Sequence, residues 1–366
     1  MVSLQIDDTY IHFKDGLNYI VGRNASGKTT IFNCIKYALG MVKSITYKHI
    51  SQVELKLSID RSELLFKREA GSLNLTVAMG SEVMNFRSQS KELDSFLRES
   101  LDPRYIFDGN TESVLKILDF CFLTEEKSVN RRQQWEAFSS ICGINIFLLN
   151  SVEKDISALK KEVAKNKELE SVVNNFSESL SVKLREINQL HELDESLEKA
   201  KFNFFREYRE KEDLLISATL KFEEIKRISN VELRNKMADI EDVFISMKHH
   251  AGFDRGYFEG IETFIKDRSK SISYGEETFS RFILILAIAR LAEDGSYNFP
   301  QIIVNDSYLS RYLDNEAYYQ AKNILDNLMS RNKELQYIEF TYRDDIPKEH
   351  MVLNLEAEGG RHVFGN

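Results

Sequence analysis

Apolar and polar residues alternate along much of the first 110 residues. A period of two is the pattern of a strand that buries one face. The alternating apolar positions are Val53, Leu55, Leu57 and Ile59, and then Leu73, Leu75 and Val77. Gly71 and Gly80 supply turn signals beside the second run, and residues 63–69 fit a further strand between the two. The pattern therefore predicts a meander of strands in this part of the chain.

The pattern changes between Gly143 and Gly252, where no glycine or proline occurs. Apolar residues now recur at steps of three and four, which predicts long helices with an a/d seam. The predicted seam residues are Val152, Ile156, Leu159, Val163, Leu169, Val173, Phe176, Leu180, Leu184 and Ile187, and later Leu233, Met237, Ile240, Phe244 and Met247. One unbroken helix would extend on the order of 150 Å, whereas a hairpin returns both ends to one place.

The tip of this predicted hairpin has two polar candidates. Residues 174–179 are one, and residues 191–195, which we slightly prefer, are the other. The seam is interrupted around residues 202–208. An ordinary helical subdomain packed on the rest of the protein is therefore the alternative to a coiled coil.

Beyond Gly252 the sequence alternates between helix and strand patterns. The predicted elements are a helix at 279–291, a strand at 302–304, a helix at 316–328 and a strand at 335–341. We therefore expect an α/β protein with an antiparallel helical hairpin inserted between two lobes. The expected N-terminal lobe is residues 1–143, the hairpin residues 144–251 and the C-terminal lobe residues 252–366.

Composition and charge limit the class of protein. The chain has 366 residues, of which 42% are hydrophobic, so it can bury a sizeable core. No apolar run approaches the roughly 18 residues of a membrane span, and the N-terminus lacks a basic region followed by an apolar one. We therefore expect a cytoplasmic protein with no membrane partner. The net charge of −9 argues against a uniformly basic coat for nucleic acid but leaves a local cationic stripe open.

The cysteines and histidines do not indicate a metal site. Cys34, Cys121 and Cys142 lie far apart and form no CxxC pair, so we expect buried small hydrophobes. The adjacent His249 and His250 would point about 100° apart on a helix, which suits one metal ion poorly.

Residues 22–29 read GRNASGKT and fit the pattern GxxxxGK[ST] without a mismatch. The apolar run 17–21 precedes them as a strand and residues 30–39 follow as a helix, so the loop aims its N–H groups and a helix N-terminus at one point. That geometry binds phosphate. Lys28 would reach the β- and γ-phosphates, and the Thr29 hydroxyl would hold Mg²⁺. The predicted nucleotide-binding residues of this loop are Gly22, Asn24, Ala25, Ser26, Gly27, Lys28, Thr29 and Thr30.

Later segments separate this P-loop from those of small kinases and GTPases. Residues 272–276, ISYGE, precede the apolar helix and resemble the LSGGE or LSGGQ signature of ABC ATPases with one glycine replaced. Residues 300–306, PQIIVND, form an apolar strand that ends in a carboxylate, which is a Walker B arrangement. Asp306 is thus placed to support the Mg²⁺ shell with Thr29. Residues 313–314, Leu-Asp, resemble a D-loop.

The order of these motifs resembles the ATPase heads of the SMC, RecN and RecF proteins and of the zinc-hook repair ATPases. In those families a lobe with the P-loop and a lobe with the signature and Walker B are joined by a coiled coil. The resemblance implies that the chain binds ATP and Mg²⁺ and forms a homodimer through its heads, each nucleotide being covered by Ser273 and Gly275 of the other subunit. It also implies catalytic roles for Asp306, Ser273 and Glu276, and nucleotide contacts for Gly275 and Asp314.

The sequence departs from these families at three places. Ser307 follows Asp306, where the families usually have the glutamate that activates the attacking water. Residues 341–343 read TYR, where a switch histidine is usual. The candidates for the Q-loop position are Gln133, Gln134 and Thr124. We therefore expect an ATPase whose hydrolysis is slow or degenerate.

The resemblance also implies an output through other molecules. The predicted hairpin has neither a CxxC zinc hook nor room for a globular hinge. We expect the head dimer to couple its nucleotide state to double-stranded DNA or to a separate effector, most simply a nuclease, in DNA repair or antiviral defence. A nucleotide-gated interaction scaffold with little hydrolysis is the alternative. A transporter ATPase subunit is disfavoured because such subunits lack a long coil between the Walker motifs.

Overall fold

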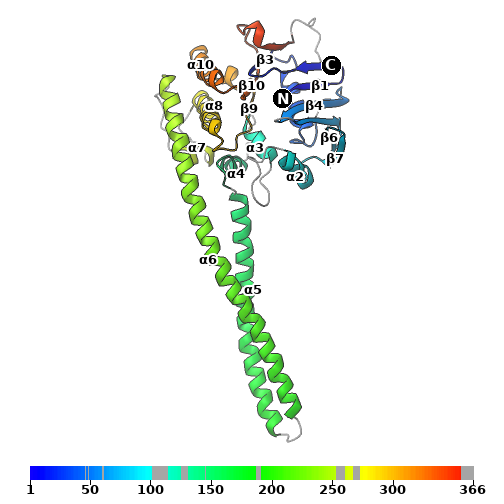
Figure 1. The fold of residues 1–366 in the computed structure, drawn as a ribbon, viewed down its shortest axis with the longest axis vertical. Helices are drawn as coiled ribbons and strands as arrows, with labels where there is room; N and C mark the ends of the chain where they lie inside the picture. Colours follow the sequence, from blue (N-terminus) through cyan, green and yellow to red (C-terminus); the bar gives the residue numbers. More distant parts are fainter. Residues whose placement is uncertain are drawn as a thin grey trace. The chain divides into compact units, whose positions relative to one another are not determined.

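The computed structural model describes residues 1–45, 47, 49–59, 62–100, 114–124, 131–144, 146–186, 191–252, 260–266 and 273–355. The chain forms two compact units. The larger comprises Met1–Asn145 together with Leu233–Asn366, and the smaller is Ile146–Glu232. Figure 1 shows that the larger unit is built of sheets and helices and the smaller unit of two long helices.

A five-stranded parallel sheet lies in the larger unit (Figure 1). Its strands lie in the order β11 (Met351–Asn354), β3 (Leu17–Val21), β10 (Gln336–Thr341), β9 (Ile302–Asp306) and β8 (Phe122–Leu123). All four pairings are parallel, so the carboxyl ends of the strands share one edge. The predicted strands at 302–304 and 335–341 are confirmed. Because β10 separates β3 from β9, Phe340 pairs with Ile20 on one side and Asp306 on the other.

A six-stranded antiparallel sheet forms a second layer. Its strands lie in the order β2 (Thr9–His12), β1 (Ser3–Ile6), β4 (Gln52–Ile59), β5 (Ser62–Glu69), β6 (Asn74–Met79) and β7 (Glu82–Arg87). The predicted alternation is confirmed in β4 and β6, where Val53, Leu55, Leu75 and Val77 are buried. Leu73 precedes β6 and is exposed, so the alternation begins later than predicted.

Helix α1 (Lys28–Ala38) packs between the two sheets. Its Ile31 and Phe32 belong to one hydrophobic core that also contains Phe66 of the antiparallel sheet and Phe340 of the parallel sheet. The Phe32 ring lies 5.9 Å from that of Phe340 and 5.6 Å from that of Phe122, measured between centroids. The core therefore fixes the helix that follows the P-loop against both layers.

The larger unit has further helices, the first of which contacts the last strand of the antiparallel sheet, β7. They are α2 (Lys91–Ser100), α3 (Val114–Phe120), α4 (Arg131–Ile141), α7 (Ile261–Lys266), α8 (Tyr274–Leu291), α9 (Tyr308–Tyr312) and α10 (Asn315–Arg331), with short 3-10 turns at Ala292–Asp294 and Lys348–His350. The predicted helices at 279–291 and 316–328 are confirmed as α8 and α10. From Phe282 to Ala289 every residue of α8 is buried, which explains its almost unbroken apolar sequence.

Two long helices, α5 (Ile146–Glu186) and α6 (His191–His250), form the glycine-free segment. Within the smaller unit two ion pairs join them, Lys211 with Glu162 and Lys226 with Glu153, each at 2.8 Å between nitrogen and oxygen. The later lysine on α6 pairs with the earlier glutamate on α5, so the two helices are antiparallel, as predicted (Figure 1).

Both candidates for the hairpin tip are wrong. Helix α5 continues through residues 174–179, and the preferred candidate, residues 191–195, is the beginning of α6. Residues 187–190, between the two helices, lie outside the described part of the chain.

The buried face of α5 follows a seven-residue spacing that some of its apolar residues do not share. Ile156, Val163 and Ser177 are buried and are spaced by seven and fourteen residues, whereas Leu169 and Phe176 are 42% and 63% exposed. The geometry of the helix determines which positions face the partner helix. An apolar residue one position before such a position is therefore exposed to solvent, and the predictions for Leu169 and Phe176 are wrong. The predicted α6 positions that are buried are Leu233, Ile240, Phe244 and Met247, while the side chains of Leu180, Leu184 and Ile187 lie outside the described residues.

Among the described residues, none of the helices is both long and apolar enough to cross a membrane. Cys34, Cys121 and Cys142 are buried free thiols, as predicted. Burial raises the pKa of Cys34 and of Cys142 to about 12, so neither forms a reactive thiolate near neutral pH.

Candidate nucleotide-binding site

The loop after β3 turns sharply before α1 begins at Lys28. The Gly22 N–H donates to the Thr341 carbonyl at 3.1 Å, and the chain then passes through left-handed conformations at Ala25 (φ 64°) and Gly27 (φ 101°). A Cβ atom at Gly22 would lie 2.4 Å from Ser26 Oγ. The Cβ atoms of Ser26 and Leu355 would each lie 3.1 Å from it, so the close packing of the loop favours glycine at this position.

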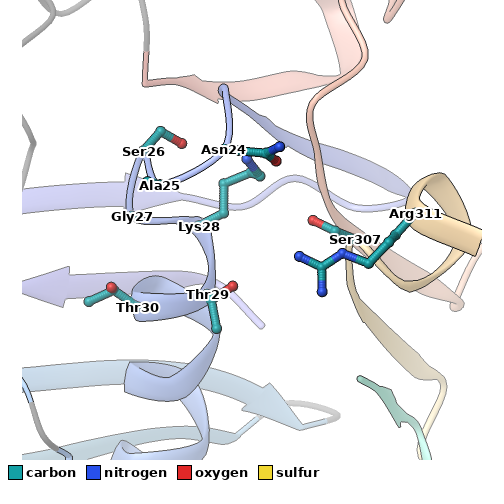
Figure 2. A pocket seen from close by; sticks show the side chains of 9 residues that line it. All are labelled: Asn24, Ala25, Ser26, Gly27, Lys28, Thr29, Thr30, Ser307 and Arg311. Atoms are coloured by element: carbon teal, nitrogen blue, oxygen red, sulfur yellow. The ribbon is translucent and has the colours of Figure 1, made fainter. Parts of the chain in front are cut away.

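The loop forms one wall of a cleft of about 260 Å³ (Figure 2). The cleft is lined by Asn24, Ala25, Ser26, Gly27, Lys28, Thr29, Thr30, Ser307 and Arg311. The buried Ser26 hydroxyl has no hydrogen-bond partner. The lining combines a lysine with the backbone N–H groups of a loop that leads into a helix N-terminus, which is an arrangement that binds phosphate. The residues present therefore fit a phosphate-bearing ligand.

Lys28 is buried at the start of α1. Its ammonium donates to the carbonyl oxygens of Gly22 at 2.6 Å and Arg23 at 2.7 Å. The loop's own backbone thus holds a cation inside the cleft, beside the N–H groups that the loop presents.

Thr29 of helix α1 and Asp306 of strand β9 bring two oxygen ligands together. The Thr29 hydroxyl donates to Asp306 Oδ1 at 3.3 Å. Burial raises the pKa of Asp306 to about 6, although the hydrogen bond from Thr29 opposes this effect. No group of three or more His, Cys, Asp or Glu side chains suited to a metal occurs among the described residues. A hydroxyl and a carboxylate fit Mg²⁺, which usually takes its other ligands from phosphates and water.

The opposite wall comes from the segment after β9. Ser307 adopts a left-handed conformation (φ 56°), and its hydroxyl donates to the Phe340 carbonyl at 2.8 Å. Arg311, on α9, reaches the same cleft (Figure 2) and was not predicted. Its only signal in the sequence is its place four residues after Ser307, which is one helical turn.

The predicted signature residues lie at the start of α8. Ser273 caps this helix, accepting from the Glu276 N–H at 3.3 Å. The Tyr274 ring stacks on Tyr312 at 6.0 Å between centroids, and a Cβ at Gly275 would lie 2.9 Å from the Tyr312 carbonyl oxygen. Ser273 and Tyr274 are exposed. Neither they nor Gly275 or Glu276 are among the described residues that line the cleft of their own chain.

Two other predicted positions have structural contacts. Asp314 caps α10, because its carboxylate accepts from the Ala317 N–H at 2.8 Å. The Tyr342 hydroxyl, near the expected switch histidine, donates to the Ser310 carbonyl of α9. The Tyr342 contact fastens α9, the helix that carries Arg311.

The Q-loop candidates lie in different elements. Thr124 directly follows β8, whose Leu123 pairs with Asn305 of β9, so Thr124 is level with Asp306 at the carboxyl edge. Gln133 and Gln134 lie in α4, and Gln134 accepts from Arg281 at 3.0 Å. The register favours Thr124 for this position.

A parallel sheet with this loop and Asp306 at its carboxyl edge, interrupted by a helical insertion, defines a P-loop ATPase head. A family model described as an AAA domain matches residues 3–242, more than half of the chain. The chain therefore belongs to the AAA domain family. No curated protein sequence matches it.

The fold is similar to solved structures of SMC heads. One is the Smc head domain of Pyrococcus furiosus with an extended coiled coil, bound to the C-terminal domain of ScpA, with a TM-score of 0.54 and 14% identity over 93% of this chain and 89% of that one. Another is the Smc head domain of Pyrococcus yayanosii with a coiled coil and joint, with a TM-score of 0.50 and 13% identity over 93% and 91%. The predicted class, an SMC-like ATPase head with an inserted helical hairpin, is confirmed.

Proposed function

We propose that this protein binds Mg·ATP in the P-loop cleft and dimerises head to head, so that its nucleotide state controls DNA or a partner protein. The observation that carries the proposal is the cleft itself. Lys28 and Thr29 converge there from the P-loop, and Asp306 meets Thr29 from β9.

In this proposal each group has a defined role. The backbone N–H groups of residues 24–30 and the Lys28 ammonium bind the phosphates. Thr29 and Asp306 hold Mg²⁺, which when bound neutralises charge on the phosphate oxygens. The protein's part is to fix these donors before the ligand arrives, because positioning and electrostatics dominate phosphoryl chemistry.

The exposed signature supports the proposed dimer. Ser273 is exposed and lies outside its own cleft, so in our proposal it and Gly275 cover the nucleotide of a second subunit. Glu276, from the same turn, and Asp314 are proposed as further contacts. ATP would then join the two heads.

A separate partner fits a chain without a second catalytic constellation in its sequence. A similar SMC head has been solved bound to the C-terminal domain of ScpA, which supports a protein partner on a head of this fold. We propose that the partner here is an effector, with a nuclease as the first candidate, and that duplex DNA lies across the ATP-closed dimer in the cytoplasm.

ATP binding is tested by replacing Lys28 with alanine. The parent protein should gain thermal stability from Mg·ATP, since a ligand at 100 times its Kd stabilises by about 2.7 kcal/mol. We expect Lys28→Ala to lose this gain, measured from the melting temperature of the ligand-free variant itself, because the substitution also removes the hydrogen bonds to Gly22 and Arg23. Lys91→Ala, an exposed position on α2, is the control. A Lys28→Ala protein stabilised as much as the parent would refute the site.

Ser307 favours a second candidate function. Among the described residues that line the cleft none is a carboxylate, so the usual general base is absent from its walls. A nucleotide-gated scaffold that binds ATP, closes, and hydrolyses it slowly or not at all is consistent with that lining. Single-turnover hydrolysis measured beside dimer lifetime separates the two functions.

A further inference from the structure

Arg311 lies in the cleft although no recognised motif includes it. It lines the cleft with Lys28 and Thr29, and in Figure 2 its guanidinium extends from α9 toward the P-loop side. We propose that Arg311 binds the terminal phosphate of ATP held by the P-loop of the same subunit, and so distinguishes ATP from ADP. This inference rests on the proposed ATP site.

The short helix that carries Arg311 is fastened at both ends. At its start, the Tyr308 N–H donates to the buried Asn305 side chain at 2.9 Å. Near its end, the Tyr342 hydroxyl donates to the Ser310 carbonyl. A side chain on a fixed backbone has less freedom to lose when it binds a ligand. The position of Arg311 is thus set by the fold before any nucleotide arrives.

The charge of the cleft suits an anion beside Arg311. The described lining residues include the cations Lys28 and Arg311 and no carboxylate. The Arg311 N–H donates to the Ser307 carbonyl at 3.0 Å, which places the arginine one turn beyond the residue where a glutamate is usual. A guanidinium can bind two phosphate oxygens at once. Such a group stabilises charge on the phosphate and does not activate water.

The side of the cleft from which Arg311 comes decides which phosphate it contacts. In loops of this type the backbone N–H groups hold the inner phosphates and the lysine reaches outward. Arg311 comes from the other wall, from the segment that follows Asp306. Its contact is therefore with the outermost phosphate, which ADP lacks.

The experiment measures the Kd of Mg·ADP and of a non-hydrolysable Mg·ATP analogue by calorimetry on the full chain. We expect Arg311→Ala to weaken binding of the analogue about tenfold or more, because the loss of one charged hydrogen-bonding group has an effect of that size. Binding of ADP, which lacks the outermost phosphate, should weaken by about twofold at most. Arg311→Lys should recover part of the loss. Arg290→Ala, at an exposed position on α8, should match the parent, and ligand-free melting temperatures check folding.

The same titrations in a Ser273→Arg background, where the proposed dimer face is blocked, test whether the contact is within one subunit. The loss should persist there. Unchanged affinity for the analogue, an equal loss for ADP, or a loss that disappears in the Ser273→Arg background would each overturn the inference. A parent that binds neither nucleotide would instead refute the proposed ATP site itself.

Discussion

A buried arginine joins the P-loop helix to the antiparallel sheet. Arg68 of β5 is 1% exposed, and its five N–H groups all donate to carbonyl oxygens, those of Tyr37, Val42, Lys43 and Ser72. Its guanidinium also lies 3.8 Å from the centroid of the Tyr37 ring. Several of these carbonyls belong to or follow the C-terminal end of α1, where a cation is favoured. The charge is therefore satisfied without a carboxylate, and the helix that begins at the P-loop is held at its other end.

Glu339 is buried in β10 and gives stability a pH dependence. It is 2% exposed and accepts from the hydroxyls of Tyr337 at 3.0 Å and Tyr318 at 3.3 Å. Burial raises its pKa from 4.5 to about 7, although these hydrogen bonds oppose the rise. The folded state therefore holds this proton more tightly than the unfolded state does, so stability falls as pH rises from about 4.5 to about 7.

We expect Glu339→Gln to lose this component of the pH dependence. At 1.36 kcal/mol per pKa unit the component is about 3 kcal/mol between the two limits. Urea unfolding of parent and variant from pH 5 to pH 8 measures it as the difference between their slopes. Glu334→Gln, at a nearby exposed position, is the control and should follow the parent. Parallel curves for the parent and Glu339→Gln would show that Glu339 titrates normally.

The missing glutamate at position 307 has a direct kinetic test. We expect Ser307→Glu to accelerate ATP turnover, since a well-placed general base contributes a factor of about 10² to 10⁴. Ser307→Gln, which has nearly the same shape without the charge, should remain as slow as the parent in a steady-state phosphate-release assay. A fast parent, or equal rates for Glu and Gln, would indicate that Glu276, Asp314 or another carboxylate serves as the base.

At the level of elements, the start of α8 carries the signature residues, and a substitution there tests the proposed dimer. Ser273→Arg places a bulky cation at the exposed start of α8, where the second head would approach in the proposed dimer. We expect this variant to bind the ATP analogue but not to dimerise. Light scattering with the analogue measures the dimer fraction, and Ser81→Arg, an exposed turn position between β6 and β7, adds the same charge elsewhere. A dimer fraction equal to the parent's would contradict the proposed arrangement.

Elements that depend on a local pattern were predictable, and those that depend on distant pairing were not. The P-loop, β9 and α8 each follow from one continuous run of residues. Strands β1 and β2 have four residues each, too few for a periodic signal, and they are fixed by pairing with each other and with β4.

The same distinction holds within the candidate site. Lys28 and Thr29 could be placed because they belong to one motif. Arg311 could not, because its position in the cleft depends on the order of β3, β10 and β9 in the sheet. Phe176 shows an error in the other direction. Its apolar character predicted a buried seam position, but the buried residue is the neighbouring Ser177 and Phe176 is exposed.

At the level of the whole molecule, the net charge of −9 sets an expectation for DNA. We expect weak binding by the isolated protein and ATP-dependent binding by a complex with the proposed partner. That binding should occur through a local patch and weaken steeply with salt. Fluorescence anisotropy of a labelled duplex across a salt series, with and without the ATP analogue, measures this. Binding that is absent or insensitive to salt in both nucleotide states would favour the scaffold function.

The strand order of the parallel sheet also determines when the site can form during synthesis. Leu17 pairs with Tyr337, and Ile302 pairs with Gln336, so β3 and β9 are connected only after β10 has left the ribosome. Strands β4 to β7 pair with their sequence neighbours and can form earlier, because local contacts form faster than distant ones. A nascent chain therefore carries the whole P-loop motif long before it has a nucleotide site.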